Sequence, residues 1–392
     1  MSQENRPTST ISETDRHATN IELFLDLVFV FAVAQIVTVL AADPTPAGFG
    51  RGLLLAWLVW WLWSQFAWLG TAIDLGRSSR NQISVLVAVP LTLLMAIAIP
   101  NAYEGSGLQF AAAYLVVNLW CLAIQGQAVW SDPLTRTAWL QYAPIASVAP
   151  LLLLAGALLN GSARVIGWCG VAAITIASAL AASRNNEEGK TAWSVNAAHF
   201  AERHALFVII SLGEVMVAIG VAASLAAAGV DVVIGLGVLA TAALACSLWW
   251  AYFAFVPRAV EHALAIAPDH ERGRVARDLF TFGHFPIVFG ILLYALTAKH
   301  VVIDPTHQLG APDLFALAAG VALFAGGLTV LRWRIIRSVG PERPVAIVVV
   351  AALCAGVGPR VPGTVIVALV ALVIVIMQSV TLWRIQARTS RR

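Results

Sequence analysis

Twelve apolar runs of about twenty residues each follow one another along this sequence, and they constrain its fold more than any other feature. Apolar residues make up 59% of the 392 residues and charged residues only 11%, whereas soluble proteins carry about 25% charged residues. A water-soluble fold would need a polar shell around this apolar surface, and the residues for that shell are missing. The sequence therefore predicts an all-α integral membrane protein with about twelve transmembrane helices.

The predicted spans are bounded by charges, prolines and glycines. They cover residues 20–41, 50–72, 82–100, 108–130, 138–158, 163–183, 204–226, 232–255, 279–301, 311–332, 344–358 and 361–384. The eleventh is short, and Pro359 and Pro362 leave only a tight turn after it. This segment is therefore predicted either to span the membrane or to form a re-entrant hairpin.

Lysine and arginine residues test the helix count, because cytoplasmic loops of membrane proteins are enriched in them. When the connections are assigned alternately to two sides, all but four of the 24 basic residues fall on one side. The four exceptions are Arg51, Arg164, Lys299 and Arg360. We therefore expect twelve spans with both the N- and C-termini in the cytoplasm.

The spans are predicted to form two six-helix halves. We expect a polar N-terminal cytoplasmic segment at 1–19, the first half at 20–183, a cytoplasmic connection at 184–203, the second half at 204–384 and a basic cytoplasmic tail at 385–392. The division rests on a weak internal repeat, in which short matches keep their order in both halves: Asp15-Arg16-His17-Ala18 with Glu202-Arg203-His204-Ala205, Trp60-Trp61 with Trp249-Trp250, Arg80-Asn81 and Pro90 with Arg277-Asp278 and Pro286, and Phe110-Ala111 with Phe315-Ala316. Six helices is an even number, so the two halves would be parallel repeats.

Ionisable side chains inside the spans are candidate ion- or substrate-binding residues, because charge is expensive in hydrocarbon. Glu22 and Asp26 are four residues apart and share one face of the first helix, with Gln35 further along it. Glu214 lies some 15 Å into a core about 30 Å thick and is the deepest acid. It either joins helices by a hydrogen bond or binds a proton or cation. Asp26 either forms a salt bridge with an arginine such as Arg203 or contacts a substrate.

Seven further positions have both a structural and a functional interpretation. Glu202 and Arg203 stand at the start of the seventh predicted helix, where a basic residue is usually an interfacial anchor. His284 precedes Pro286 by two residues, so it could exchange a proton beside a backbone carbonyl that the proline leaves free, or simply hydrogen-bond a neighbour. The tryptophan pairs Trp60, Trp61 and Trp249, Trp250 either pack as bulky side chains or contact a ligand or cation.

Catalytic and metal-binding motifs are missing from the sequence. It contains no GxSxG, no HExxH, no Walker loop and no His or Cys spacing for a metal. The four cysteines fall in separate apolar runs, where we expect small buried hydrophobes. The basic residues are scattered, which argues against a nucleic-acid partner. We therefore expect no cofactor, no metal and no catalytic residue.

The run Glu22-Leu23-Phe24-Leu25-Asp26-Leu27-Val28-Phe29-Val30-Phe31-Ala32 resembles the opening motif of the low-temperature-requirement A (LtrA) family of bacterial membrane proteins. The segment from Glu202 to Glu214 is similar to its second characteristic segment, with Glu202, Arg203, Gly213 and Glu214 at the recurrent positions, and His284-Phe285-Pro286 resembles a third. The chain has His204 where the family usually has an aromatic residue. The resemblance implies a bacterial inner-membrane protein related to growth in the cold, with no assigned biochemical activity.

The leading functional hypothesis is a secondary transporter or a proton- or cation-coupled carrier for a small solute or ion, surrounded by lipid. Asp26 and Glu214 would be a coupling pair, with hydrogen bonds from His284 and Gln35, while the halves rock about the site. Two alternatives stay open. One is an intramembrane enzyme that acts on a lipid or lipid-linked substrate, which a large cavity open to lipid would favour. The other is a non-catalytic factor for sensing or scaffolding in the cold.

Overall fold

The computed structural model describes residues 17–72, 75, 78–182, 195–225 and 231–389, and helices make up most of them. Twelve helical segments in this part of the chain are long and apolar enough to cross a membrane, as the sequence predicts. Each of the five predicted segments lies partly outside the described residues. The undescribed residues are 1–16 of the N-terminal segment, 73–74, 76–77 and 183 of the first half, 184–194 of the connection, 226–230 of the second half and 390–392 of the tail.

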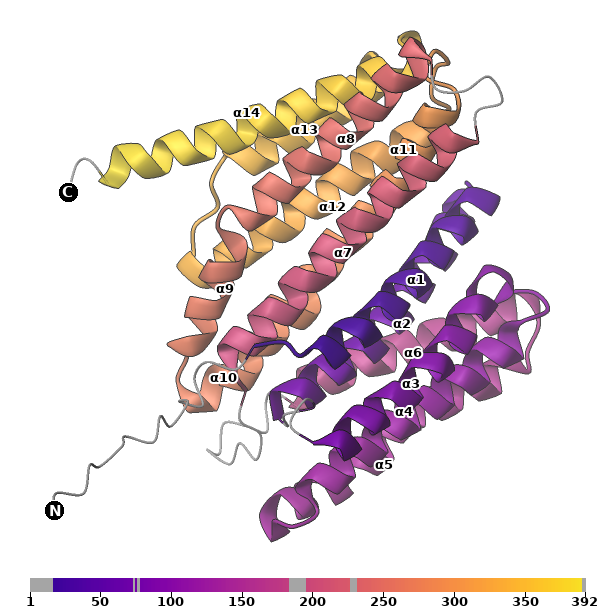
Figure 1. Ribbon diagram of the computed structural model, residues 1–392, viewed down its shortest axis with the longest axis vertical. Coiled ribbons are helices and arrows are strands. Elements are labelled where there is room, and N and C mark those ends of the chain that lie inside the picture. Colours follow the sequence, from indigo (N-terminus) through magenta and orange to yellow (C-terminus); the bar gives the residue numbers. More distant parts are fainter. Residues whose placement is uncertain (1–16, 73–74, 76–77, 183–194, 226–230, 390–392) are drawn as a thin grey trace, which may run out of the picture.

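The first group of helices occupies one side of the molecule (Figure 1). It contains α1 (Asn20–Ala42), α2 (Pro46–Ala72), α3 (Ser79–Ala98), α4 (Gly107–Val129), α5 (Pro133–Ala157) and α6 (Gly161–Ala182), with a short 3₁₀ turn, Ile99–Asn101, after α3. Pro90 lies inside α3, and Pro144 and Pro150 lie inside α5.

The second group lies beside the first and contains α7 (Ala197–Ser224), α8 (Val232–Phe253), α9 (Val256–Ala265), α10 (Asp269–Ala276), α11 (Gly283–Ile303), α12 (Ala311–Ile336), α13 (Glu342–Gly356) and α14 (Gly363–Thr389). A π-helical turn, Arg277–Phe282, joins α10 to α11. The connection between the eighth and ninth predicted spans is therefore helical except at residues 266–268. The two groups meet where α1 and α2 contact α7 and α11, and we call this contact surface the seam.

Helix α7 begins at Ala197, whereas the sequence predicts a start at 204. The Asn196 side chain caps the helix, because its Oδ1 accepts a hydrogen bond from the His199 backbone N–H at 3.0 Å. Asparagine is among the preferred residues at this position. Arg203 and His204 therefore lie in the second turn of α7 rather than at its entrance.

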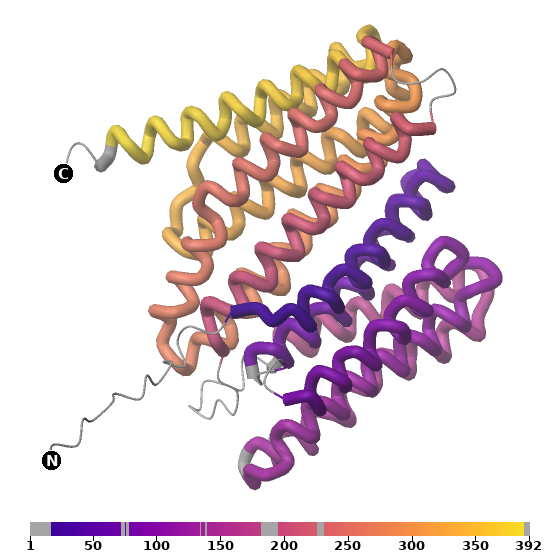
Figure 2. The backbone as a smooth tube through the Cα atoms, in the orientation of Figure 1, coloured from indigo at the N-terminus to yellow at the C-terminus, as the bar shows by residue number. Residues whose placement is uncertain are grey.

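The eleventh predicted span crosses the bundle. The turn between α13 and α14 lies beside the connection between α11 and α12, because the Gly363 N–H donates to the His307 carbonyl at 2.8 Å and the Thr364 hydroxyl donates to the Pro305 carbonyl at 2.8 Å. Helix α12 runs away from that connection and α13 returns to it (Figure 2). The structure thus has a spanning α13 rather than a re-entrant hairpin.

Helices α2 and α11 form the centre of the molecule, since 83% of the membrane-length window of each is buried. The repeat would pair the second span with the eighth and the third with the ninth. However, the corresponding windows are 33% buried in the eighth span and 44% buried in the third. Equivalent positions thus have different surroundings, and the internal repeat stays a prediction.

A glycine pair brings α11 and α12 into close contact. A Cβ atom on Gly290 would lie 2.5 Å from the Gly320 carbonyl oxygen, and one on Gly320 would lie 2.8 Å from the Gly290 carbonyl oxygen. Small residues allow such an approach of membrane helices. Of the four cysteines, all of them free, Cys121 and Cys354 are buried as expected, whereas Cys169 and Cys246 are exposed on the outer surface of the bundle.

Candidate functional site

A cluster of charged side chains lies buried in the seam, and we call it the seam cluster. It comprises Glu22 and Asp26 from α1, His199 and Arg203 from α7, and Trp63 from α2. None of these five residues exposes more than 1% of its surface. Charges buried to this degree are rare unless they are paired.

Arg203 joins the two carboxylates. Its Nε and Nη2 atoms donate to the two oxygens of Asp26 at 3.0 and 2.6 Å, and its Nη1 donates to Oε1 of Glu22 at 2.8 Å. The contact with Asp26 is bidentate, the geometry that a planar guanidinium favours. The sequence left two interpretations of Asp26 open, a salt bridge and a substrate contact. The structure shows the salt bridge, with Arg203 as the partner.

Three other residues also contact the carboxylates. Nε2 of His199 lies 3.0 and 3.1 Å from the two oxygens of Glu22. The Thr19 backbone N–H and hydroxyl donate to Oε2 of Glu22 at 2.9 and 2.8 Å, and the indole N–H of Trp63 donates to Asp26 at 2.7 Å. The cluster therefore holds both acids in fixed positions.

Sequence spacing explains how two helices build this cluster. Glu22 and Asp26 are four residues apart on α1, and His199 and Arg203 are four residues apart on α7, so each pair shares one helix face. Gly70 of α2 makes the necessary room, because a Cβ atom there would lie 2.2 Å from Oε1 of Glu22 and 2.9 Å from Cε1 of His199.

The charges of the seam cluster do not cancel without a proton. Two carboxylates face one guanidinium, which leaves one negative charge in a buried site. His199 is the only other titratable side chain in contact with these carboxylates among the described residues. A net charge in such a place is costly, and one added proton would cancel it.

A second layer of polar side chains lies next to the cluster. The rings of His204 and His284 are 5.1 Å apart, and His204 also contacts Trp63 at 4.8 Å between ring centroids. Nδ1 of His284 lies 2.8 Å from the Leu279 carbonyl, and its Nε2 lies 2.8 Å from the Tyr252 hydroxyl. His204, at the position where the family usually has an aromatic residue, therefore packs as an aromatic ring.

Trp60 contacts the π turn that precedes α11. Pro286 lies inside α11 and has no backbone N–H to donate, and the carbonyl that it leaves free near His284 stays a prediction. The indole N–H of Trp60 donates to the carbonyl of Thr281, which belongs to the π turn Arg277–Phe282, at 2.8 Å. Trp60 thus links α2 to the π turn across the seam.

Several predicted site residues lie away from the cluster. Glu202 points to the N-terminal side of α1, where it accepts a hydrogen bond from the Ala18 N–H at 2.6 Å. Trp61 stacks on Trp57 with 6.0 Å between centroids. On α8, Trp249 is exposed and Trp250 is half-buried, so neither enters the seam cluster.

The predicted pair of Asp26 and Glu214 is wrong as a geometric arrangement. Glu214 lies eleven residues beyond Arg203, or about 16 Å along α7, whereas Asp26 contacts Arg203 directly. Glu214 is half-buried and makes no hydrogen bond or ion pair with any described residue. Gln35 follows Asp26 by nine residues, which places it on the opposite face of α1 at about 100° per residue.

Sequence reasoning missed His199, Trp63 and Tyr252. His199 precedes the predicted start of the seventh helix, although Asn196 is a recognisable capping residue. Spacing could have found it, because His199 stands four residues before Arg203. Trp63 and Tyr252 carried no local signal that separated them from the other aromatic residues of their helices.

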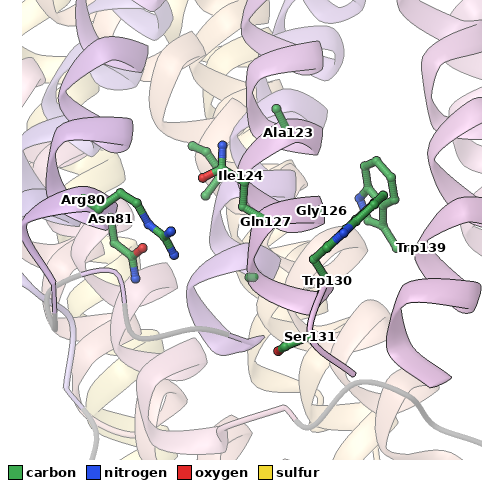
Figure 3. A pocket seen from close by; sticks show the side chains of 10 residues that line it. Arg80, Asn81, Ala123, Ile124, Gly126, Gln127, Trp130, Ser131 and Trp139 are labelled. Carbon is green, nitrogen blue, oxygen red and sulfur yellow. The ribbon is translucent and has the colours of Figure 1, made fainter. Parts of the chain in front are cut away.

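A cavity of about 830 Å³ opens between α3, α4 and α5, away from the candidate acids (Figure 3). An enzyme that used the intramembrane acids would need them in such a space, and no acid is among the described residues that line it. No group of three or more His, Cys, Asp or Glu side chains in the described part of the chain is placed to hold a metal.

The fold and the seam cluster define a multi-pass α-helical membrane protein whose two helix groups are joined by buried ion pairs. The chain belongs to the bacterial low temperature requirement A protein (LtrA) family, whose sequence profile matches residues 17–379. It is 30% identical over 323 residues to an uncharacterized protein of Rhizobium meliloti (strain 1021), covering 78% of this chain and 75% of that protein. No solved structure matches it.

Proposed function

We propose that this protein is a proton-coupled secondary transporter for a small solute or ion. The observation that carries the proposal is the seam cluster: it joins the two helix groups, it is fully buried, and it needs one proton for neutrality. Intramembrane ionisable groups with these properties are typical of proton relays in transporters.

The proposed transport cycle depends on the charge of the seam cluster, which differs between its protonated and deprotonated states. With a proton between His199 and Glu22, the cluster is neutral and stabilises contact between α1 and α7. Loss of the proton leaves one negative charge in the seam, and this charge favours opening of the seam to water or a cation. The two helix groups then rock about the site, so that proton binding and exposure of the substrate site are linked.

The proposed location is the inner membrane of a bacterium, with both termini in the cytoplasm. The support is the distribution of basic residues, because all but four of the 24 lie on one side of the twelve-span arrangement. We call this side the basic face. The starts of α1 and α7 and the seam cluster lie toward it, so the cluster would exchange its proton with the cytoplasm first.

The test is a pH-jump assay with the full chain in proteoliposomes that contain a pH-sensitive dye. Small organic cations, anions, amino acids and sugars are added one at a time as probes. At least one class should drive proton movement that depends on the wild-type protein. Glu22→Gln and His199→Gln should both abolish this movement.

Glu202→Gln is the matched control, because it removes a carboxylate next to Arg203 that lies outside the seam cluster. It should behave as the wild type. The proposal is overturned if no probe moves protons through the wild type, or if Glu22→Gln retains the wild-type rate.

A further inference from the structure

The cavity between α3, α4 and α5 lies at the basic face of the molecule. It is bounded by the first turn of α3, the last turns of α4 and the first turns of α5 (Figure 3). All three helix ends meet the same side of the membrane, because α3 and α5 begin where α4 ends. The cavity therefore lies at the depth of lipid headgroups rather than at the membrane centre.

One uncompensated positive charge faces this space. Arg80 lines the cavity, is exposed, and its guanidinium makes no ion pair or hydrogen bond with any described residue. The neighbouring acid, Asp132, does not line the cavity, and its carboxylate accepts hydrogen bonds from the N–H and hydroxyl of Thr135 at 3.0 and 2.7 Å. The cavity thus attracts an anion.

A second donor is built into the cavity wall. The indole nitrogen of Trp139 is buried and has no hydrogen-bond partner in the described part of the chain. Its ring lies against Gly126, where a Cβ atom would come within 2.7 Å of it. Buried donors normally have partners, and an unsatisfied one calls for an explanation such as a bound group. Gln127 and Ser131 add polar atoms to the same wall.

An apolar stripe continues from the cavity into the membrane. Val116, Leu119, Ala123 and Gln127 are all exposed and spaced three or four residues apart, so they form one face of α4. Ala123 and Gln127 line the cavity, while Val116 and Leu119 lie deeper in the membrane. A ligand that fills both parts has an anionic head and an apolar chain.

We propose that this cavity binds an anionic glycerophospholipid from the leaflet at the basic face. Arg80 and the indole N–H of Trp139 contact its phosphate, and an acyl chain lies along the stripe on α4. Trp130 also lines the cavity, and the guanidinium of Arg136 lies 5.8 Å from the centre of its ring. This site is independent of the seam cluster and of the proposed transport.

The experiment measures lipid binding to the full-length protein in detergent by native mass spectrometry and by the shift in melting temperature. Phosphatidylglycerol is the probe, phosphatidylcholine tests the need for negative charge, and inorganic phosphate tests the need for an acyl chain. We expect phosphatidylglycerol to bind and stabilise, with at least about tenfold weaker binding in Arg80→Gln, since a charge-assisted hydrogen bond is lost.

Two further variants make the test specific. Trp139→Phe keeps the ring against Gly126 but removes the N–H donor, so it should weaken phosphatidylglycerol binding. Arg258→Gln is the matched control, because Arg258 is an exposed arginine of α9 without an ion pair among the described residues. It should bind phosphatidylglycerol as the wild type does.

Three outcomes would overturn the proposal. The first is equal binding of phosphatidylglycerol and phosphatidylcholine. The second is stabilisation by inorganic phosphate alone that equals the effect of the lipid, which would identify a soluble anion as the ligand. The third is unchanged lipid binding in both Arg80→Gln and Trp139→Phe, with each variant folded as judged by its melting temperature without lipid.

Discussion

Arg203 shows how a single side chain can hold two helix groups together. It is fully buried, and it donates to carboxylates that precede it by 177 and 181 residues in the chain. Removing one partner of a buried ion pair costs about 3–5 kcal/mol, because a charge is left without compensation. Arg203 pairs with two buried carboxylates, so its loss should destabilise the protein more than the loss of any other basic residue.

The variant Arg203→Gln should therefore be destabilised by at least about 3 kcal/mol. Its melting temperature in detergent, followed by fluorescence-detected size-exclusion chromatography, is the measurement. Arg258→Gln serves as the control and should melt as the wild type does, because Arg258 is exposed. Equal melting temperatures for Arg203→Gln and the wild type would contradict the role of Arg203.

Trp63 offers a milder test at the same site. Trp63→Phe keeps an aromatic ring but removes the N–H that donates to Asp26 at 2.7 Å. A lost hydrogen bond to a buried charged group costs about 1–3 kcal/mol. Trp383→Phe, at a position that is 66% exposed, should cost nothing measurable. If both tryptophan variants melt alike, the hydrogen bond to Asp26 contributes no stability.

At the scale of the helix, hydropathy predicted most of the elements. It placed the start of α7 too late, because charged residues were taken to mark the helix end. Apolar runs give helices directly, since a backbone in lipid must satisfy its own hydrogen bonds. The rule that charges mark helix ends failed at Glu202 and Arg203, because Arg203 is neutralised by residues of α1. The sequence offered the ion pair between Asp26 and Arg203 as one of two interpretations, but it could not decide between them, because pairing across the seam depends on how the helices pack.

The contact between α11 and α12 is tested by its glycines. Gly290→Val should destabilise the protein by about 1–3 kcal/mol, because the new side chain would overlap the backbone of α12. Gly326→Val is the control on α12, where a Cβ atom would meet nothing within 4 Å. Thermal unfolding in detergent compares the two, and an equal effect at both positions would show that the close approach contributes nothing.

At the scale of the whole molecule, the number of spans could be predicted, but the arrangement of the helices could not. When twelve spans are assumed, nearly all basic residues fall in connections on one side of the membrane, which agrees with the twelve membrane-length helices of the structure. Neither hydropathy nor charge shows that α2 and α11 occupy the centre, because this depends on which helices pack together. The pairing of Asp26 with Glu214 relied on an expected symmetry between halves, and their different surroundings explain why it was wrong.

The path of α13 gives a test of the whole topology. In a background without the four native cysteines, Ser338→Cys before α13 and Arg360→Cys after it should react with a membrane-impermeant maleimide from opposite sides. Ser338→Cys should react only after the membrane is permeabilised, and Arg360→Cys should react in intact cells. Labelling of both from one side would contradict a spanning α13.

The central claim is that the seam cluster holds one exchangeable proton. Proton uptake can be counted with an indicator dye when the detergent-solubilised protein is shifted from pH 8.5 to 5.5, the range in which an imidazole normally exchanges its proton. Glu22→Gln leaves one carboxylate opposite Arg203, so this variant should take up about one proton fewer per molecule than the wild type, whereas Glu202→Gln should take up the wild-type number. Equal uptake by Glu22→Gln and the wild type would contradict the claim.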